Sequence, residues 1–143
     1  MKKLVFLLAL TAISVAAFAQ NPVGTWKGKI QIDKSALAGV QDPKQKEMAS
    51  KALAQVEAMT LTLNVKANKT FVVNIPSMMG QPAQSSEGTW TQKGNQVTLV
   101  TTKRQGKAVT NDKPKSMTLD KGGKKMVMTA NEGPQKATIT FTR

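Results

Sequence analysis

The sequence contains no cysteine, no histidine and no tyrosine. Disulfides are therefore excluded, as are zinc sites built from cysteine and histidine and iron–sulfur clusters held by cysteine. Neither a serine–histidine–aspartate triad nor a cysteine–histidine pair can be assembled. We therefore expect a protein that is not an enzyme, with no catalytic residues, no cofactor and no metal.

Acidic residues are scarce as well, because eight Asp and Glu stand against 21 Lys and Arg, for a formal net charge of +13. A basic surface of this kind attracts anionic partners such as lipid headgroups, acidic polysaccharides or nucleic acid. Nucleic-acid binding usually adds aromatic side chains on which bases stack, and aromatic residues make up only 4% of this chain. We therefore keep an anionic component of the cell envelope as a candidate partner and do not expect nucleic acid.

The N-terminus has the pattern of a secretory signal peptide. Met1-Lys2-Lys3 precedes an apolar run, Leu4–Phe18, and Ala17-Phe18-Ala19 is a small-x-small cleavage site. The run is shorter than the roughly 20 residues of a membrane-spanning helix, although a retained N-terminal anchor is the alternative. We predict a signal peptide at 1–19 and one domain at 20–143. No cysteine that could carry a lipid anchor follows the cut, so we expect a soluble monomer, periplasmic or secreted.

Most of the remaining chain alternates between apolar and polar residues, which is typical of half-buried β-strands. The first such strand is predicted at about 24–33, and the alternation resumes after Met59 as seven more short strands joined mostly by tight turns. Between them, Asp42-Pro43 is a helix start, and apolar residues follow it at helical spacing up to Met59.

These patterns predict a mainly β fold, an eight-stranded antiparallel up-and-down barrel with a helical insertion between strands 1 and 2. Closing the barrel pairs every strand edge and buries one face of each strand. A sandwich of two sheets is the alternative. The insertion is interpreted either as a lid over the barrel or as cover for its core.

Short motifs resemble those of known families. Gly24-Thr25-Trp26 resembles the G-x-W opening of the calycins, which include the lipocalins and fatty-acid-binding proteins. Leu61–Phe71, Gly88-Thr89-Trp90-Thr91 and Val97-Thr98-Leu99 resemble the bacterial lipocalin-like families of short exported proteins. Lipocalins carry their helix after the last strand, whereas this insertion is similar to the helical lid of fatty-acid-binding proteins, which have ten strands.

The resemblance implies a structural closure of the barrel by Gly24, Trp26 and Arg143. In lipocalins the tryptophan plugs the closed end, and a basic side chain after the last strand packs across it. Arg143 shares its parity with Ile139 and Phe141, and should therefore reach the face that carries Trp26. Such a cation–π contact contributes about 0.5–2 kcal/mol.

An eight-stranded barrel is either filled by its own side chains or holds one small ligand, and the sequence leaves both interpretations open. For an acidic ligand we expect a cation from Lys103, which continues the parity of Val97, Leu99 and Thr101. The predicted ligand-binding residues of the barrel interior are Ile32, Leu63, Phe71, Val73, Trp90, Leu99, Met117, Met126, Met128 and Lys103.

Two functions follow from these two interiors. A hollow barrel indicates an exported lipocalin-like binding protein for a small apolar or amphiphilic ligand, such as a lipid, in the cell envelope. A filled barrel indicates a non-enzymatic interaction module whose basic surface or Ser77–Ser86 loop contacts an envelope protein or an anionic polymer. A cavity of several hundred Å³ favours the first function.

Overall fold

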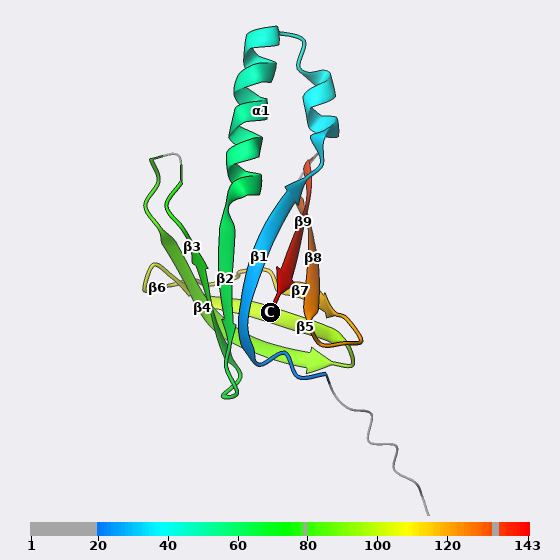
Figure 1. Ribbon diagram of the computed structural model, residues 1–143. Helices are drawn as coiled ribbons and strands as arrows, with labels where there is room; N and C mark the ends of the chain where they lie inside the picture. The colour runs from blue at the N-terminus through cyan, green and yellow to red at the C-terminus, as the bar shows by residue number, and fades with distance from the viewer. Residues whose placement is uncertain (1–19, 79, 133–134) are drawn as a thin grey trace, which may run out of the picture.

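The computed structural model describes residues 20–78, 80–132 and 135–143, so the predicted signal peptide at 1–19 lies outside the described residues. The described residues form nine strands and two helical segments (Figure 1). Their bounds are β1 Gly24–Ile32, the 3-10 helix η1 Lys34–Gly39, α1 Pro43–Ala58, β2 Thr60–Val65, β3 Thr70–Ile75, β4 Gln84–Lys93, β5 Gln96–Arg104, β6 Lys107–Ala108, β7 Lys115–Leu119, β8 Lys125–Glu132 and β9 Gln135–Thr142. None of the helices in the described part of the chain is long and apolar enough to cross a membrane.

Eight of the strands close into a barrel. Each pairs antiparallel with its neighbour along the chain, β5 pairs with β7, and β9 returns to pair with β1. The remaining strand, β6, has two residues and pairs with the end of β5 alone. The predicted eight-stranded antiparallel up-and-down barrel is thus confirmed, and the two-sheet sandwich is not formed.

The helical insertion leaves the barrel at the end of β1 and returns at the start of β2. Asp42 caps α1 by accepting a hydrogen bond from the backbone N–H of Lys44 at 2.8 Å, and Pro43 is its first residue. At the other end of the helix, Glu57 lies 3.5 Å from Lys34 Nζ, which ties the helix base to the segment after β1. No residue of α1 is buried, and the helix extends away from the barrel (Figure 1). The interpretation of α1 as core cover is therefore wrong.

One end of the barrel is filled by large side chains. Its two indoles are buried and donate hydrogen bonds to backbone carbonyls, Trp26 to Pro22 and Trp90 to Lys66, both at 2.8 Å. The other fully packed residues at this closed end are Leu63, Val65, Val97, Leu119 and Met126.

Two glycines make room for two phenylalanine rings inside the barrel. A Cβ on Gly28 would lie 2.5 Å from the ring of Phe141, which faces it across β1 and β9. A Cβ on Gly88 would lie 2.8 Å from the ring of Phe71, which faces it across β3 and β4. Each ring therefore lies close to the bare backbone of its glycine, and both rings form part of the barrel interior.

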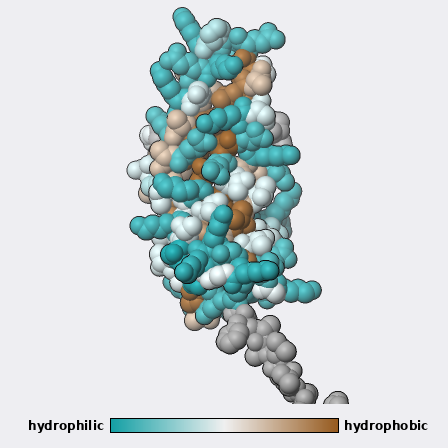
Figure 2. All heavy atoms as spheres, turned by 45° about the vertical axis from the view of Figure 1, so that its right-hand side comes forward, coloured by the Kyte–Doolittle hydropathy of each residue, from teal (hydrophilic) through white to brown (hydrophobic). Residues whose placement is uncertain are grey.

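Hydrophilic side chains cover most of the face shown in Figure 2. Hydrophobic residues show between them, also among the helices at the top of the view. Met48 on α1 is the most exposed large hydrophobic side chain among the described residues, at 72%. This face of the molecule is thus mostly hydrophilic.

Candidate ligand-binding cavity

The open half of the barrel contains a cavity of about 520 Å³. Its buried apolar lining comes from Leu61, Phe71, Leu99, Met117 and Phe141, and half-buried apolar residues continue it towards the mouth: Val73, Ile75, Met128 and Ile139. Gln84, Ser86, Thr101, Arg104 and Lys115 supply the polar part. The barrel is thus filled at one end and hollow at the other.

The hollow half follows from the side chains that the strands supply there. Ser86 on β4 and Thr101 on β5 are small, and the paired position on β3 is Val73. Deeper in the barrel, β4 and β5 instead carry Trp90 and Leu99, which pair across the two strands. Because the same two strands carry small residues at the mouth and large ones deeper in the barrel, side chains fill the closed half of the interior and leave the open half hollow. The volume lies within the range of small-molecule sites, about 300–1,000 Å³.

Five of the predicted ligand-binding residues line this cavity: Phe71, Val73, Leu99, Met117 and Met128. Leu63, Trp90 and Met126 are buried in the closed half and do not line it. Ile32, near the end of β1, is half-buried and also lies outside the lining. Period-two alternation finds which residues point inward, but it does not say at which height along the barrel the side chains leave space.

The expected orientation of Lys103 is wrong, because β5 contains a bulge. Gly88 of β4 pairs with Thr101, yet the adjacent Glu87 pairs with Lys103, so Thr102 is an extra residue. The alternation of faces shifts by one position at this point. Lys103 is exposed opposite Glu87, and Arg104, opposite Ser86, lines the cavity in its place.

Gly88 is the residue that the bulge requires. A Cβ at this position would lie 1.9 Å from the carbonyl oxygen of Val100, a backbone atom that cannot move aside without breaking the strand pairing. Glycine inside a strand often marks a bulge or a close backbone approach. Two features of the sequence could have indicated that Arg104 lines the cavity. Gly88 lies inside a strand, where glycine suggests a bulge, and two basic residues, Lys103 and Arg104, follow each other at the end of the next strand.

An ion pair lies at the mouth of the cavity. Arg104 Nη2 donates to Asp112 Oδ1 at 2.6 Å, and the side chain of Asp112 is only 13% exposed. The side chain of Thr101, followed by the positive charges of Arg104 and Lys115, holds the pKa of Asp112 below its usual value despite the opposing effect of burial. The carboxylate is therefore ionised at neutral pH. Its second oxygen, Oδ2, is buried and has no hydrogen-bond partner among the described residues.

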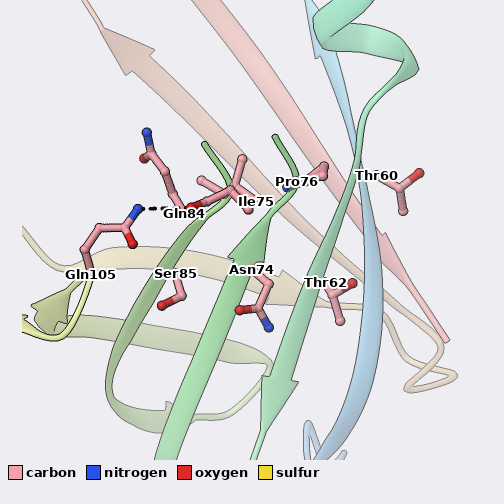
Figure 3. A pocket seen from close by; sticks show the side chains of 9 residues that line it. Thr60, Thr62, Asn74, Ile75, Pro76, Gln84, Ser85 and Gln105 are labelled. Carbon is pink, nitrogen blue, oxygen red and sulfur yellow. Dashed lines mark hydrogen bonds between the residues drawn. The ribbon is translucent and has the colours of Figure 1, made fainter. Parts of the chain in front are cut away.

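A second, shallower pocket of about 280 Å³ lies beside the mouth (Figure 3). Side chains of β2, β3 and β4 line it, among them Thr62, Asn74 and Ser85. Gln105 closes one side by donating a hydrogen bond from Nε2 to the carbonyl oxygen of Ala83 at 3.2 Å. Its lining contains hydroxyl and amide groups but no charged side chain, so it offers no strong electrostatic recognition.

Comparisons with known proteins add little to this geometry. No protein-family model and no curated protein matches the sequence. Among solved structures, the chain is similar to the fluorescent protein UnaG, with 19% identity and a TM-score of 0.42 over 85% of this chain and 96% of that one. Human cRBP IV has 13% identity and a TM-score of 0.39, over 85% of this chain and 96% of the other.

A fatty-acid-binding protein from Drosophila melanogaster brain tissue also has 13% identity and a TM-score of 0.39, and the match covers 86% of this chain and all of that one. The barrel architecture therefore rests on the strand pairing described above. The lipocalin-like resemblance stays a prediction from the sequence motifs.

Proposed function

We propose that this protein is an exported, non-enzymatic binding protein that carries a small amphiphilic molecule in its barrel within the cell envelope. One observation carries the proposal: a cavity of about 520 Å³ with an apolar lining and a charged mouth. A concave, mostly apolar site with a few convergent polar groups is the usual form of a small-molecule site. The alternative of an interaction module with a filled barrel does not agree with the hollow half.

The polar groups of the mouth favour a ligand with an anionic end. Arg104 and Lys115 line the cavity, and Asp112 pairs with Arg104, so the mouth carries one positive charge in excess. Lys115 has no ion-pair partner among the described residues. An apolar tail would lie against the deep residues such as Phe71 and Met117, with its charged end near these two cations.

Methionine methyl NMR tests the cavity directly, because the chain carries its own control. Met117 and Met128 line the cavity, whereas Met126 is fully buried in the closed half and does not. With 13C-methyl methionine, dodecanoate should shift the signals of Met117 and Met128 and leave that of Met126 nearly unchanged. Tryptophan fluorescence is a poorer probe, since neither Trp26 nor Trp90 lines the cavity.

Native mass spectrometry of the protein recovered from its expression host tests the same proposal without a chosen ligand. A small-molecule adduct that is lost on denaturation supports a carrier and gives the mass of its ligand. The proposal is abandoned if no adduct is found and if dodecanoate, dodecanol and extracted envelope lipids leave the signals of Met117 and Met128 unchanged.

Export is the part of the proposal that rests on Met1–Ala19. A chain that begins at Gln20 would keep the contacts at the barrel base: Gln92 Nε2 donates to the Gln20 carbonyl oxygen at 2.6 Å, and Pro22 is fully buried. N-terminal sequencing of the protein from a periplasmic or culture fraction should begin at Gln20. Recovery only in the cytoplasm with Met1 retained would contradict export.

A further inference from the structure

The Arg104–Asp112 ion pair occupies the place where an anionic ligand would be recognised. The excess charge of the mouth attracts an anion, yet Arg104, whose side chain is 51% exposed, is already paired with a carboxylate of the same chain. Among the described residues, Asp112 is the hydrogen-bond partner of the Arg104 side chain. A ligand carboxylate therefore cannot bind Arg104 in the same way unless Asp112 moves.

The segment before β7 positions Asp112 at the mouth. After β5, the chain forms a short hairpin in which Lys103 pairs with Ala108, and the backbone N–H of Val109 donates to the Thr102 carbonyl oxygen at 2.9 Å. Asn111 then has a φ of 65°, a left-handed conformation that asparagine adopts more readily than most residues. This turn aims the following residue, Asp112, back at Arg104.

The carboxylate of Asp112 is incompletely satisfied where it lies. Oδ1 has the short bond to Arg104, and the Thr101 side chain lies beside the carboxylate, but Oδ2 is buried and makes no hydrogen bond among the described residues. A buried acceptor of this kind would be better solvated if the side chain moved outward to water. The guanidinium, in contrast, can bind an incoming carboxylate through two parallel N–H donors, of which Asp112 uses one.

We propose that Asp112 is an internal counter-ion that competes with the ligand, and that an anionic headgroup displaces it from Arg104 on binding. The inference rests on the proposed function, because it assumes a ligand in the cavity. Asp112 neutralises Arg104 while the barrel is empty and selects against weakly binding anions, which cannot displace it. The apolar tail supplies the affinity, and the exchange of one carboxylate for another decides which headgroup is accepted.

The test compares an anionic and a neutral ligand with the same chain length, dodecanoate and dodecanol, in two variants. Asp112→Asn removes the competing charge but keeps the shape of the side chain. Glu87→Gln is the matched control, because Glu87 is exposed on the outer face, opposite Lys103 and next to the cavity-lining Ser86. Dissociation constants come from titrations followed by the Met117 and Met128 methyl signals, and thermal unfolding confirms that each variant is folded.

Asp112→Asn should bind dodecanoate about tenfold more tightly than the wild type and dodecanol within about twofold of it. Glu87→Gln should leave both constants within about twofold. If the wild type binds dodecanoate and Asp112→Asn binds it equally or more weakly, the proposed counter-ion role of Asp112 is wrong. The proposal of a carrier is not affected by that result. If no protein binds either ligand, the counter-ion proposal fails, and the adduct and the envelope lipids then decide whether the protein is a carrier.

A structure of the wild type with dodecanoate bound gives a second answer that does not depend on a folded variant. The headgroup should lie within hydrogen-bond distance of Arg104, and Asp112 should have left it. A bound ligand with the Arg104–Asp112 distance still near 2.6 Å would overturn the proposal.

Discussion

The guanidinium of Arg143, the last residue of the chain, lies 4.5 Å from the ring centroid of Trp26. It also donates hydrogen bonds to the carbonyl oxygens of Val23 at 3.0 Å and Asn21 at 3.2 Å. Both ends of the described chain are thereby tied to the first strand of the barrel. A parallel arrangement lies nearby, where Lys69 Nζ is 4.0 Å from the ring centroid of Trp90.

Arg143→Gln should lower the free energy of unfolding by about 1–3 kcal/mol, because the cation–π contact and two charged hydrogen bonds are lost together. Lys69→Gln is the control, since it removes a cation over Trp90 without such bonds, and should cost about 0.5–1 kcal/mol. Urea unfolding followed by tryptophan fluorescence measures both. Equal effects of the two substitutions would mean that the bonds to Val23 and Asn21 contribute nothing.

Gly88→Ala should destabilise the protein by about 1–3 kcal/mol or more, because its Cβ overlaps the Val100 carbonyl oxygen. Any relief requires the bulge to shift, which would also turn Arg104 away from the cavity. Gly39→Ala is the control, as a Cβ there meets nothing within 4 Å. Chemical denaturation of both variants checks this, and a Gly88→Ala protein as stable as the wild type would show that the bulge does not need glycine.

Arg104→Gln should weaken dodecanoate binding about tenfold, whereas Lys103→Gln should leave it within about twofold. The two residues are adjacent and carry the same charge, but Arg104 lines the cavity and Lys103 is exposed on the outer face. Titration followed by the Met128 methyl signal distinguishes them. Equal losses in both variants would indicate general electrostatic attraction instead of recognition inside the barrel.

Stability should fall in acid because three aspartates have a pKa below their usual value of 3.8 in the folded state. Hydrogen bonds from backbone N–H groups lower the pKa of Asp33 and Asp120; the main donors are Ser35 for Asp33 and Lys125 for Asp120. The pKa of Asp112 is lowered mainly by the side chain of Thr101. A lowered folded pKa contributes stability that is present above the unfolded pKa and is lost as pH falls through the folded value. The midpoint of thermal unfolding should therefore be steady near neutral pH and drop below about pH 4.

Asp120→Asn gives a direct check on this acid limb. Asp120 Oδ1 accepts the backbone N–H groups of Lys124 at 2.8 Å and Lys125 at 2.9 Å in the turn before β8. The variant should be less stable at neutral pH and lose less stability on acidification. An unfolding midpoint that depends on pH as steeply as in the wild type would show that Asp120 does not contribute to the acid limb.

The fold class and several local features could be predicted from the order of the residues alone. Alternation with a period of two assigns each residue to a face of its strand, so the closed meander could be predicted. The position of Arg143 over Trp26 was implied by the resemblance of Gly24-Thr25-Trp26 to the calycin opening, and the parity of Arg143 agreed with it. The helix start at Asp42-Pro43 was equally local, because the cap acts on N–H groups two and three residues away. Such features depend on neighbours in the chain or on parity along one strand.

The position of the cavity in the barrel and the cation that lines it depend on how the strands pack together and could not be predicted. The cavity depends on the summed volumes of side chains from seven strands, which no single strand reveals. Arg104 lines the cavity in place of the predicted Lys103 because Thr102 is an extra residue in the pairing of β4 with β5. This backbone bulge reverses the alternation of faces on which the prediction depended. Asp112 reaches Arg104 through an irregular segment without periodicity, so their contact is a property of the folded chain alone.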